Sequence, residues 1–520
     1  MGSNKTEGTE GQELHDLIIK KDWDGALALI DPSQYEDEQE VTKKVLKTLS
    51  PLILMLKSSD GFSRELFLKL VDIGGETLVN FHNGDGTALH HACSLDDAEI
   101  IDLFRRLIEV GGKNLVLMTE KYDGQTALHR ARNAEEAKLL IEVGEKELVM
   151  MQDIDGRTAL HTILDCLSPE YMDVFRLLLD VGGEELVLMT DRDGKTALFH
   201  AFSCMNDNDF HRQLVHDILE VGGKKVALLP DRDGSTVLHN ACCNWVSYPE
   251  SVFLLLEVAG KTLTMMTDRE GKTALHCDMQ NAGTHVLHLL ETGGEKLALM
   301  TDRDGRTALH AACDWERDLP TEAYRQLIEV GGEKLLLKAD RYGSTVLHLA
   351  SSWMWKKYPE IYQQMFEIGK EKLTFMTDES GRTALHELCN NATSSTLYPE
   401  AVQIFLDFCG EELLLKADNF GSTALHYVCR LYNSRSLQDE SVSSNSSDDS
   451  SNEESGRKCL FYKIETVNRM VDVGRMKLLL IRDNACETAM EMELQQDDPS
   501  EEIIDRFLEI VGRDILLDKI

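Results

Sequence analysis

Apolar residues recur in pairs of short segments along most of the chain, with polar turns and loops between the segments. From residue 84 onward every unit follows the same order: a turn, a short helix that begins after a threonine, a loop, a second helix and a glycine. This pattern predicts paired helices. The second helices are expected at residues 103–110, 137–143, 172–181, 214–221, 251–258, 284–291, 322–330, 361–368 and 401–408, and the paired glycines after four of them are typical of a left-handed helix end.

A short phrase marks the turn and the start of each first helix. Asp-Gly-x-Thr-Ala-Leu-His occupies residues 123–129, 155–161 and 304–310, and variants of it recur along the chain. Its ten threonines are 32 to 40 residues apart: Thr87, Thr126, Thr158, Thr196, Thr236, Thr273, Thr307, Thr345, Thr383 and Thr423. A phrase that returns at such a period indicates a stacked array of repeats.

Each residue type in the phrase has a local physical use. Aspartate and glycine favour a type I turn, and glycine can take a positive φ. The threonine hydroxyl can cap the first turn of a helix, and the histidine three residues later can bond back to that cap. The alanine and leucine between them begin the buried face, so the phrase predicts a turn followed directly by a capped helix.

At these residues the chain resembles the ankyrin repeat, whose pattern is Asp-x-x-Gly-x-Thr-Pro-Leu-His-x-Ala-Ala. The resemblance covers about residues 62–491 and implies an all-α, ankyrin-type α-solenoid of about ten to twelve helix-turn-helix repeats. Alanine or valine replaces the family's proline in every copy, with valine at Val237 and Val346. The links between repeats are long, as at residues 182–189. Each link therefore forms either the hairpin finger usual in the family or an extra helical turn.

The expected organisation is a disordered leader at residues 1–10, a pair of capping helices at 11–40 and a repeat array at 41–520. Within the array, residues 434–457 form an acidic, serine-rich insert that interrupts the period. Its polar, low-complexity composition predicts disorder. Ser446, Ser450 and Ser451 each precede an acidic residue by three positions, which suits phosphorylation by an acid-directed kinase.

The chain carries 54 basic and 91 acidic side chains, which gives a formal net charge of −37. This charge opposes binding to nucleic acid or to an anionic membrane as a main activity. No membrane span or secretory signal is visible, and the twelve cysteines show no extracellular disulfide framework, so we expect a cytoplasmic or nuclear protein. Gly2 fits the formal pattern for myristoylation, but no polybasic segment accompanies it.

No set of residues in the sequence is typical of a catalytic, cofactor or metal site. The chain lacks a phosphate-binding glycine loop, a zinc-protease motif, a kinase set and a nucleophile elbow. The repeated histidines have a structural use at the helix caps. Cysteines that follow five of them by three residues stand where the family has a small buried residue. We therefore expect no enzyme activity, no cofactor and no metal.

Two sets of side chains are candidates for binding a partner. The residue two before the turn glycine is arginine in five successive copies: Arg192, Arg232, Arg269, Arg303 and Arg341. This arginine row either pairs with neighbouring turn acids such as Asp191 and Asp231, or forms a basic strip for an acidic peptide. Trp245, Trp315 and Trp353 follow first helices, where they either cover the end of the core or act as interface anchors.

The resemblance implies that turn tips and first helices line a groove that holds partner proteins. We therefore expect a non-catalytic protein–protein interaction scaffold or adaptor, with an acidic partner segment if the arginine row is a binding strip. The alternative is a regulatory subunit that is gated by phosphorylation of the insert at residues 434–457.

Overall fold

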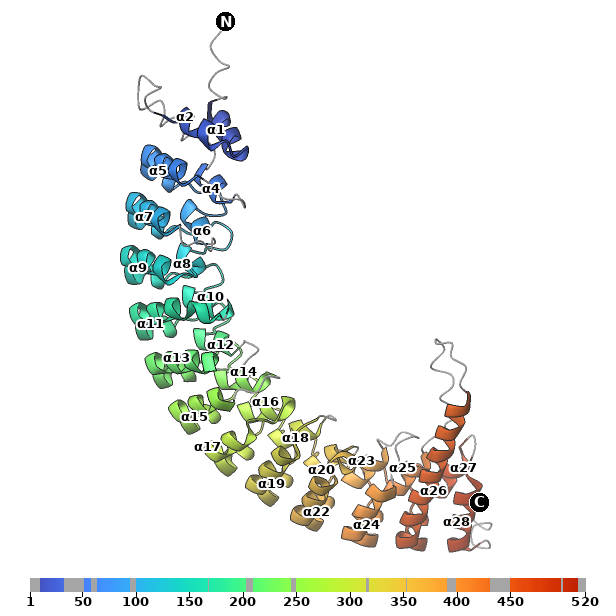
Figure 1. Ribbon diagram of the computed structural model, residues 1–520. Helices are drawn as coiled ribbons and strands as arrows, with labels where there is room; N and C mark the ends of the chain where they lie inside the picture. Colours follow the sequence, from blue (N-terminus) through green and yellow to red (C-terminus); the bar gives the residue numbers. More distant parts are fainter. Residues whose placement is uncertain are drawn as a thin grey trace. The chain divides into compact units, whose positions relative to one another are not determined.

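A computed structural model of the chain describes residues 10–31, 51–57, 63–93, 100–166, 168–202, 209–244, 249–314, 318–351, 353–390, 399–430, 449–496 and 499–512. These residues divide into two compact units (Figure 1). The first unit comprises residues 1–241 with 248–263, and the second comprises residues 242–247 with 264–520. Each unit is described by itself.

The first unit begins with two short helices, α1 (Glu10–Ile19) and α2 (Trp23–Leu29). Pairs of one short and one longer helix follow: α4 (Pro51–Leu56) with α5 (Arg64–Val79), α6 (Ala88–Ala92) with α7 (Ile101–Val116), α8 (Ala127–Arg130) with α9 (Ala134–Val149), α10 (Ala159–Cys166) with α11 (Met172–Val187), α12 (Ala197–Ala201) with α13 (Asp209–Leu228), and α14 (Val237–Cys243) with α15 (Pro249–Thr264). A 3-10 turn, η3 (Pro169–Tyr171), precedes α11.

The second unit continues the same order. Its pairs are α16 (Ala274–Asn281) with α17 (Val286–Ala298), α18 (Ala308–Cys313) with α19 (Thr321–Leu336), α20 (Val346–Ala350) with α22 (Pro359–Thr374), α23 (Ala384–Asn390) with α24 (Pro399–Leu414), α25 (Ala424–Arg430) with α26 (Asp449–Leu479), and α27 (Ala489–Leu494) with α28 (Glu501–Val511). The short α21 (Met354–Lys357) lies between α20 and α22.

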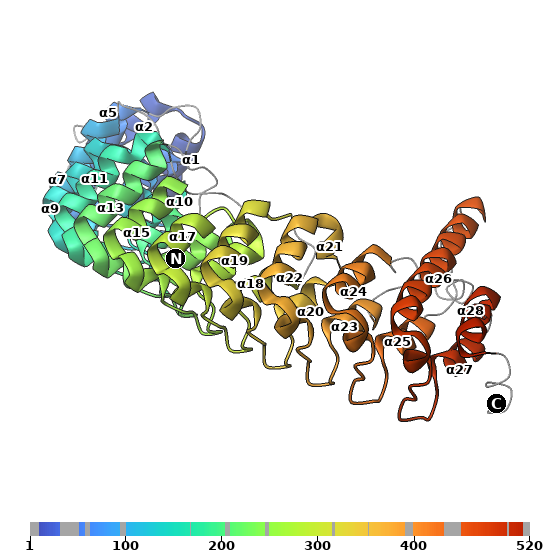
Figure 2. The same cartoon turned by 90° about the horizontal axis from the view of Figure 1, so that it is seen from below.

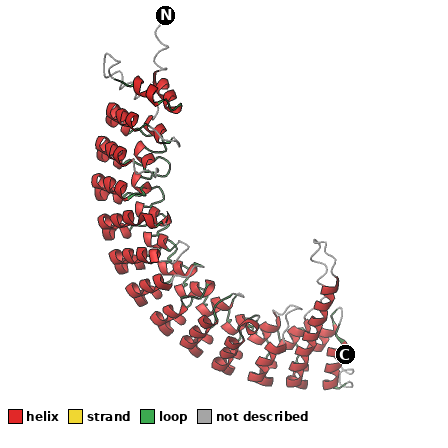
Figure 3. Cartoon of the chain, viewed as in Figure 1, coloured by secondary structure: helices red, strands yellow, loops and turns green. Residues whose placement is uncertain are grey.

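The described residues therefore form twelve helix pairs, from α4 with α5 to α27 with α28. Within each unit the longer helices pack side by side in one layer and the short helices in another (Figures 1 and 3). No β-strand occurs among these residues. Isolated antiparallel bridges, such as Thr190 with Thr196, close several of the turns. The predicted all-α array of helix-turn-helix repeats is confirmed.

The core lies between the two layers and is built from the apolar face of each helix. In α11 the buried side chains include Val174, Phe175, Leu178 and Leu179, whose spacing places them on one helical stripe. The alanine and leucine of the repeated phrase are also buried, as at Ala197 and Leu198. Each helix pair buries its apolar face only against its neighbours, as the sequence pattern indicates.

The paired glycines differ from the predicted helix stop. Gly183 has φ 59° and ψ −152°, after which the helix resumes and ends at Val187. A side chain on Gly182 would bring its Cβ within 2.5 Å of the Leu186 Cβ, so the first glycine allows the new turn to fold back onto the helix. The expected end at residue 181 is therefore wrong, and the link holds an extra helical turn.

Three residues with side chains occupy the position of the second glycine. Glu145, Lys370 and Arg475 have φ values of 53°, 50° and 47°, with ψ near that of Gly183. This region of the backbone map is essentially restricted to glycine, and a residue with a Cβ is strained there by about 1–3 kcal/mol. These three links are therefore the strained members of the series.

Disorder is expected throughout the insert at residues 434–457, but the second half of the insert is helical. Residues 431–448 lie outside the described residues, whereas α26 is helical from Asp449 onward. Its packed part begins further along, with Val467, Met470 and Val471 buried. Propagation adds one hydrogen bond per residue to a helix that has already formed. A polar segment can therefore continue the helix without a core of its own.

The expected leader at residues 1–10 and Gly2 fall almost entirely outside the described residues. Helices α1 and α2 lie inside the range expected for the capping helices, and residues 32–50 are not described. Within the described part of the chain, no helix combines the length and the apolar character needed to cross a bilayer.

The strained links give a stability prediction. Lys370→Gly should stabilise the second unit by about 1 kcal/mol, because it relieves the backbone strain at the cost of some unfolded-chain entropy. Gly332→Lys should destabilise it by about 1–3 kcal/mol. A Cβ at Gly332 would meet no atom within 4 Å, so only its backbone angle, φ 55°, opposes the substitution. Thermal unfolding followed by circular dichroism tests both changes, and equal melting of the two variants would contradict the assignment of strain.

Candidate functional site

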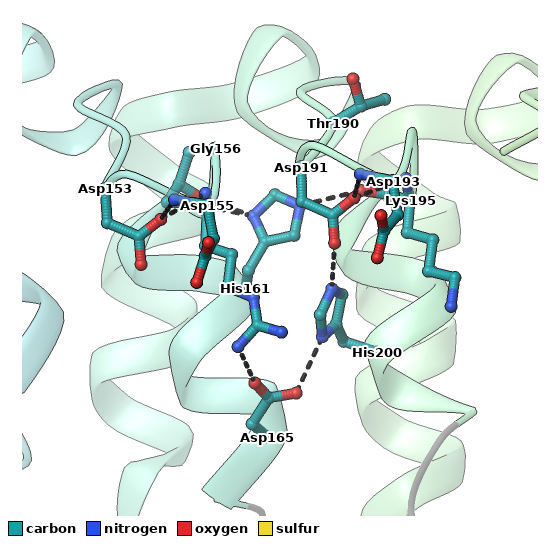
Figure 4. Close-up of polar contacts among 12 residues, drawn as sticks. Asp153, Asp155, Gly156, His161, Asp165, Thr190, Asp191, Asp193, Lys195 and His200 are labelled. Carbon is teal, nitrogen blue, oxygen red and sulfur yellow. Dashed lines mark hydrogen bonds and ion pairs between the residues drawn. The ribbon is translucent and has the colours of Figure 1, made fainter. Parts of the chain in front are cut away.

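One aspartate closes nine of the described turns between repeats, while the turns before α6 and α8 have Asn83 and Glu120 at this position. The Asp191 amide donates to the carbonyl of Lys195 at 2.9 Å, and its Oδ1 accepts from the amides of Asp193 and Lys195, both at 2.9 Å (Figure 4). The two side-chain bonds recur at Asp153, Asp231, Asp268, Asp302, Asp340, Asp378, Asp418 and Asp483. Each of these nine turns is therefore fixed by its own backbone and by one carboxylate oxygen.

The turn glycine takes a positive φ, as the phrase predicts. Gly194 and Gly305 have φ values of 81° and 77°. A Cβ at Gly194 would also lie 2.8 Å from the backbone nitrogen of Arg232 in the next turn. Glycine is needed here both for the backbone angle and for the close approach of the neighbouring turn.

The phrase histidine connects its own helix cap to the next repeat. His348 Nδ1 accepts from the Thr345 amide at 3.1 Å, and its Nε2–H donates to the carbonyl of Arg382 at 3.1 Å. The same pair of bonds occurs at His90, His129, His161, His276 and His426. One nitrogen accepts and the other donates, so these imidazoles are neutral.

Burial keeps the phrase histidines neutral. Loss of hydration lowers the pKa of His90, His161, His310 and His386 to about 4. The same cause lowers the pKa of His129, His276, His348 and His426. The predicted bond from the histidine to its cap is present, and these side chains are engaged in structure rather than open to a ligand.

A second ladder of bonds joins successive turns through their backbones. The Arg192 amide donates to the Asp155 carbonyl at 2.7 Å, and the Arg232 amide donates to the Asp193 carbonyl at 2.8 Å. In the second unit, Arg303 and Arg341 make the same bond to Glu270 and Asp304. The backbone of the arginine row is therefore fixed, and the turns of the second unit project along one edge (Figure 2).

All five side chains of the arginine row are exposed. Arg341 pairs with Asp304 of the preceding turn at 2.7 Å, and its guanidinium lies 4.6 Å from the centre of the Tyr342 ring. Among the described residues, no carboxylate lies within 4.0 Å of the guanidinium of Arg192, Arg232 or Arg303. The turn aspartates accept backbone amides instead, which limits pairing inside a turn.

The basic residues that follow the turn glycine are arranged differently. Arg157 pairs with Asp165 at 3.0 Å, Arg306 with Asp314 at 2.8 Å, and Arg382 with Glu387 at 2.8 Å. Asp165 and Glu387 stand on the short helix that begins after the same turn, and Asp314 directly follows such a helix, α18. These cations are committed within their own repeats, so the exposed arginine row is the better candidate for external contacts.

The tryptophan candidates are only partly described. Trp353 donates its indole N–H to the Cys313 carbonyl at 3.0 Å and meets the Tyr358 ring edge-on at 6.0 Å. The Tyr358 hydroxyl donates to the Leu319 carbonyl at 2.8 Å. Trp353 thus packs across the ends of neighbouring repeats. Trp245, Trp315 and Ser446 lie outside the described residues. Ser450 and Ser451 lie in the first turn of α26.

The sequence analysis missed a set of apolar side chains at the turn tips. Tyr122 is 71% exposed, Phe420 61%, Ile154 45% and Tyr342 43%. They occupy tip positions at which other copies carry charged residues. Aligning the ten turns with one another would have revealed them, because a large apolar residue at an exposed tip has no use in the core. Exposed aromatic residues are frequent anchors of protein interfaces.

Comparisons with known proteins give little beyond these geometric findings. No protein-family model matches the sequence, and no curated protein matches it. Among solved structures, the ankyrin repeat domain of Bcl-3, a member of the IkappaB protein family, is similar over 53% of this chain and 99% of that chain, with 21% sequence identity and a TM-score of 0.35.

The repeating unit is a helix-turn-helix pair with the features that the resemblance to the ankyrin repeat implies. This conclusion follows from the turn, the capped first helix and the inter-repeat histidine bond, which recur in register within each unit.

The neutral histidines predict an acid-sensitive array. The pKa of folded His90 is about 4, below the ordinary value of about 6.5, so its contribution is complete above about pH 6.5 and is lost as pH falls towards 4. His90→Gln should therefore destabilise the protein more at pH 7.5 than at pH 5, by about 2 kcal/mol.

Thermal unfolding of the wild type and His90→Gln at matched pH measures this difference. The comparison between two variants is needed because buried Asp278 and Glu120, whose pKa values are raised to about 7 by burial, act in the opposite direction in both proteins. A penalty that does not depend on pH would show that His90 is not held in its neutral form.

Proposed function

We propose that this chain is a non-catalytic scaffold or adaptor that binds one or more proteins along its turn tips. The observation that carries the proposal is the arginine row. Its backbone is fixed by the turn-to-turn bonds, while the guanidinium groups of Arg192, Arg232 and Arg303 are exposed and have no carboxylate within ion-pair distance among the described residues. Side chains on a rigid backbone lose less entropy when they bind than side chains on a mobile loop.

We infer that the partner presents an acidic segment. Guanidinium groups recognise carboxylates through paired hydrogen bonds, and arginines repeated once per turn offer such contacts at regular intervals within each unit. Acids stand beside the arginines at the tips, such as Asp193 and Asp233. A partner must therefore place its carboxylates opposite the arginines and away from these acids, so the spacing of its acidic residues matters as well as its charge. Exposed Tyr122, Tyr342 and Phe420 would add apolar anchors.

The test is to reverse the strip. Arg232→Glu, Arg269→Glu and Arg303→Glu together should weaken capture of the partner identified by pull-down and mass spectrometry. The loss should be larger at low salt, because exposed charges are screened beyond roughly 8–10 Å at physiological ionic strength. The melting temperature should hardly change, because exposed ion pairs contribute little to stability.

A matched control makes the same change in charge on another part of the repeats. Lys225, Lys334 and Lys372 lie in the extra helical turns and pair with Glu184, Glu295 and Glu333 across neighbouring repeats. Their reversal to glutamate should leave capture intact. If both triple variants lose the partner equally, net charge rather than the arginine row is responsible. If neither does, the aromatic tips become the better candidate.

A second candidate function is regulation by phosphorylation of the insert. The observation that favours it is the start of α26 at Asp449, which places Ser450 and Ser451 in its first turn. A phosphate there would be stabilised by the positive end of the helix dipole, by about 0.3–1 kcal/mol or somewhat more. Ser450→Glu with Ser451→Glu should therefore raise amide protection in α26 in hydrogen exchange. Unchanged protection and unchanged partner binding would argue against gating.

A further inference from the structure

One repeat departs from the phrase and builds a different contact between repeats. Phe199 stands where other copies have the histidine, and the histidine follows one residue later as His200. The hydroxyl of Thr196, which is buried, consequently has no hydrogen-bond partner among the described residues. The cap of α12 thus lacks the bond that the other phrase threonines make, and His200 takes a new position.

His200 lies between two carboxylates from successive repeats (Figure 4). Its Nδ1 is 2.8 Å from Asp165 Oδ1 on α10, and its Nε2 is 3.0 Å from Asp191 Oδ2 in its own turn. The His200 side chain is only 8% exposed, and that of Asp191 is 5% exposed. Ionised carboxylates only accept hydrogen bonds, so both ring nitrogens must donate and the imidazole must carry a positive charge.

The other charged and titratable groups around His200 are consistent with this state. Arg157, from the preceding turn, binds the second oxygen of Asp165 at 3.0 Å. The His161 ring on α10 meets the His200 ring edge-on at 5.2 Å; its Nδ1 accepts from the Thr158 amide and its Nε2–H donates to the Lys195 carbonyl, so it is neutral. Asp193 and Lys195 stand in the same turn as Asp191. The site therefore holds two carboxylates facing one imidazole, with Arg157 directed at Asp165.

We propose that Asp165, His200 and Asp191 form a protonation-dependent clamp between two successive repeats, which strengthens on acidification while the neutral histidine bonds of the other repeats weaken. When the proton leaves, one ring nitrogen presents a lone pair to a carboxylate at 2.8–3.0 Å, and the contact changes from attraction to repulsion. A rise in pH therefore weakens this contact between the α10–α11 and α12–α13 repeats, whereas a fall in pH weakens the neutral histidine contacts, including the bond from His161 to Lys195 in the same joint.

Electrostatics supports the geometry. Burial alone would lower the pKa of His200, but the hydrogen bonds and charges of Asp165 and Asp191 outweigh it and raise that pKa above its ordinary value. Burial likewise opposes ionisation of Asp165, yet His200 and Arg157 lower its pKa. With a raised folded pKa, the clamp is fully formed below the unfolded value of about 6.5 and is lost as pH rises through the folded value.

Titration of the full chain tests the clamp directly. Histidines labelled with ¹³C at Cε1 are followed by NMR, and His200→Gln assigns the His200 signal by its disappearance. His200 should titrate with a midpoint above about 6.5, while the phrase histidines stay neutral until far lower pH. A midpoint for His200 at or below that value overturns the proposal.

A substitution of one acceptor separates a clamp from a merely buried histidine. Asp165 is 37% exposed, so Asp165→Asn should fold, and it should lower the His200 midpoint because one charged acceptor is removed. Rescue by Asp165→Glu, which restores the charge, should return the midpoint towards that of the wild type. A midpoint that is the same in wild type and Asp165→Asn contradicts the clamp.

The pH dependence of stability gives a further test, because the loss of stability on replacing His200 should change with pH in the direction opposite to that for the phrase histidines. The melting penalty of His200→Gln should grow as pH falls towards about 6.5, whereas that of His90→Gln should stay constant above about pH 6.5 and shrink as pH falls below it. Penalties that change in the same direction in the two variants would overturn the proposal, since the clamp requires a charged imidazole where the phrase histidines are neutral.

Discussion

The array depends on a neutral imidazole that reaches from one repeat to the next. In His348 one nitrogen accepts from the cap of its own helix through a buried bond, and the other donates to the following turn through a partly buried one. A buried donor or acceptor without a partner costs about 1–3 kcal/mol. Where both bonds are made, as at His348, the histidine that closes a helix start is satisfied at its second nitrogen only when the next repeat is in register, which couples local structure to stacking.

The turn aspartate completes this coupling and determines which side chains reach solvent. Its carboxylate oxygen is occupied by two backbone amides, as at Asp302, and the amide of the next residue bonds the preceding turn. The side chain of that next residue then projects from a backbone that is fixed on both sides. Arg303 occupies this position, which explains how an arginine can be rigidly placed without pairing with the aspartate beside it in sequence.

The sequence predicts the repeats, the capped helices and the positive φ at the turn glycines, because each rests on residues close together in the chain. It leaves the extra helical turn as one of two alternatives for the links. Gly182 and Gly183 favour a helix end by their sequence alone. The packing of Leu186 over Gly182, which favours the extra turn, depends on how the folded chain turns back and cannot be read from the residue types. The His200 clamp is likewise hidden, because Asp165 is 35 residues away from it. The exposed tips Tyr122 and Phe420 required a comparison of all turns at the same position.

Cations that form ion pairs within the protein occupy different positions in the repeat from the arginines that do not. Lysines in the extra helical turns pair with glutamates across neighbouring repeats, as Lys334 does with Glu295 at 2.8 Å, and arginines after the turn glycine pair with acids on the following helix, as Arg306 does with Asp314. Pairing is frequent in this chain of net charge −37 but it is not general, because exposed Lys121, Lys138 and Lys296 also have no carboxylate within ion-pair distance among the described residues. Arg192, Arg232 and Arg303 remain without an acidic neighbour within ion-pair distance among the described residues, although acids are abundant. What sets these three arginines apart is that they share one structural position on a backbone held by turn-to-turn bonds, and this regular placement is what the proposed contact with an acidic partner would use.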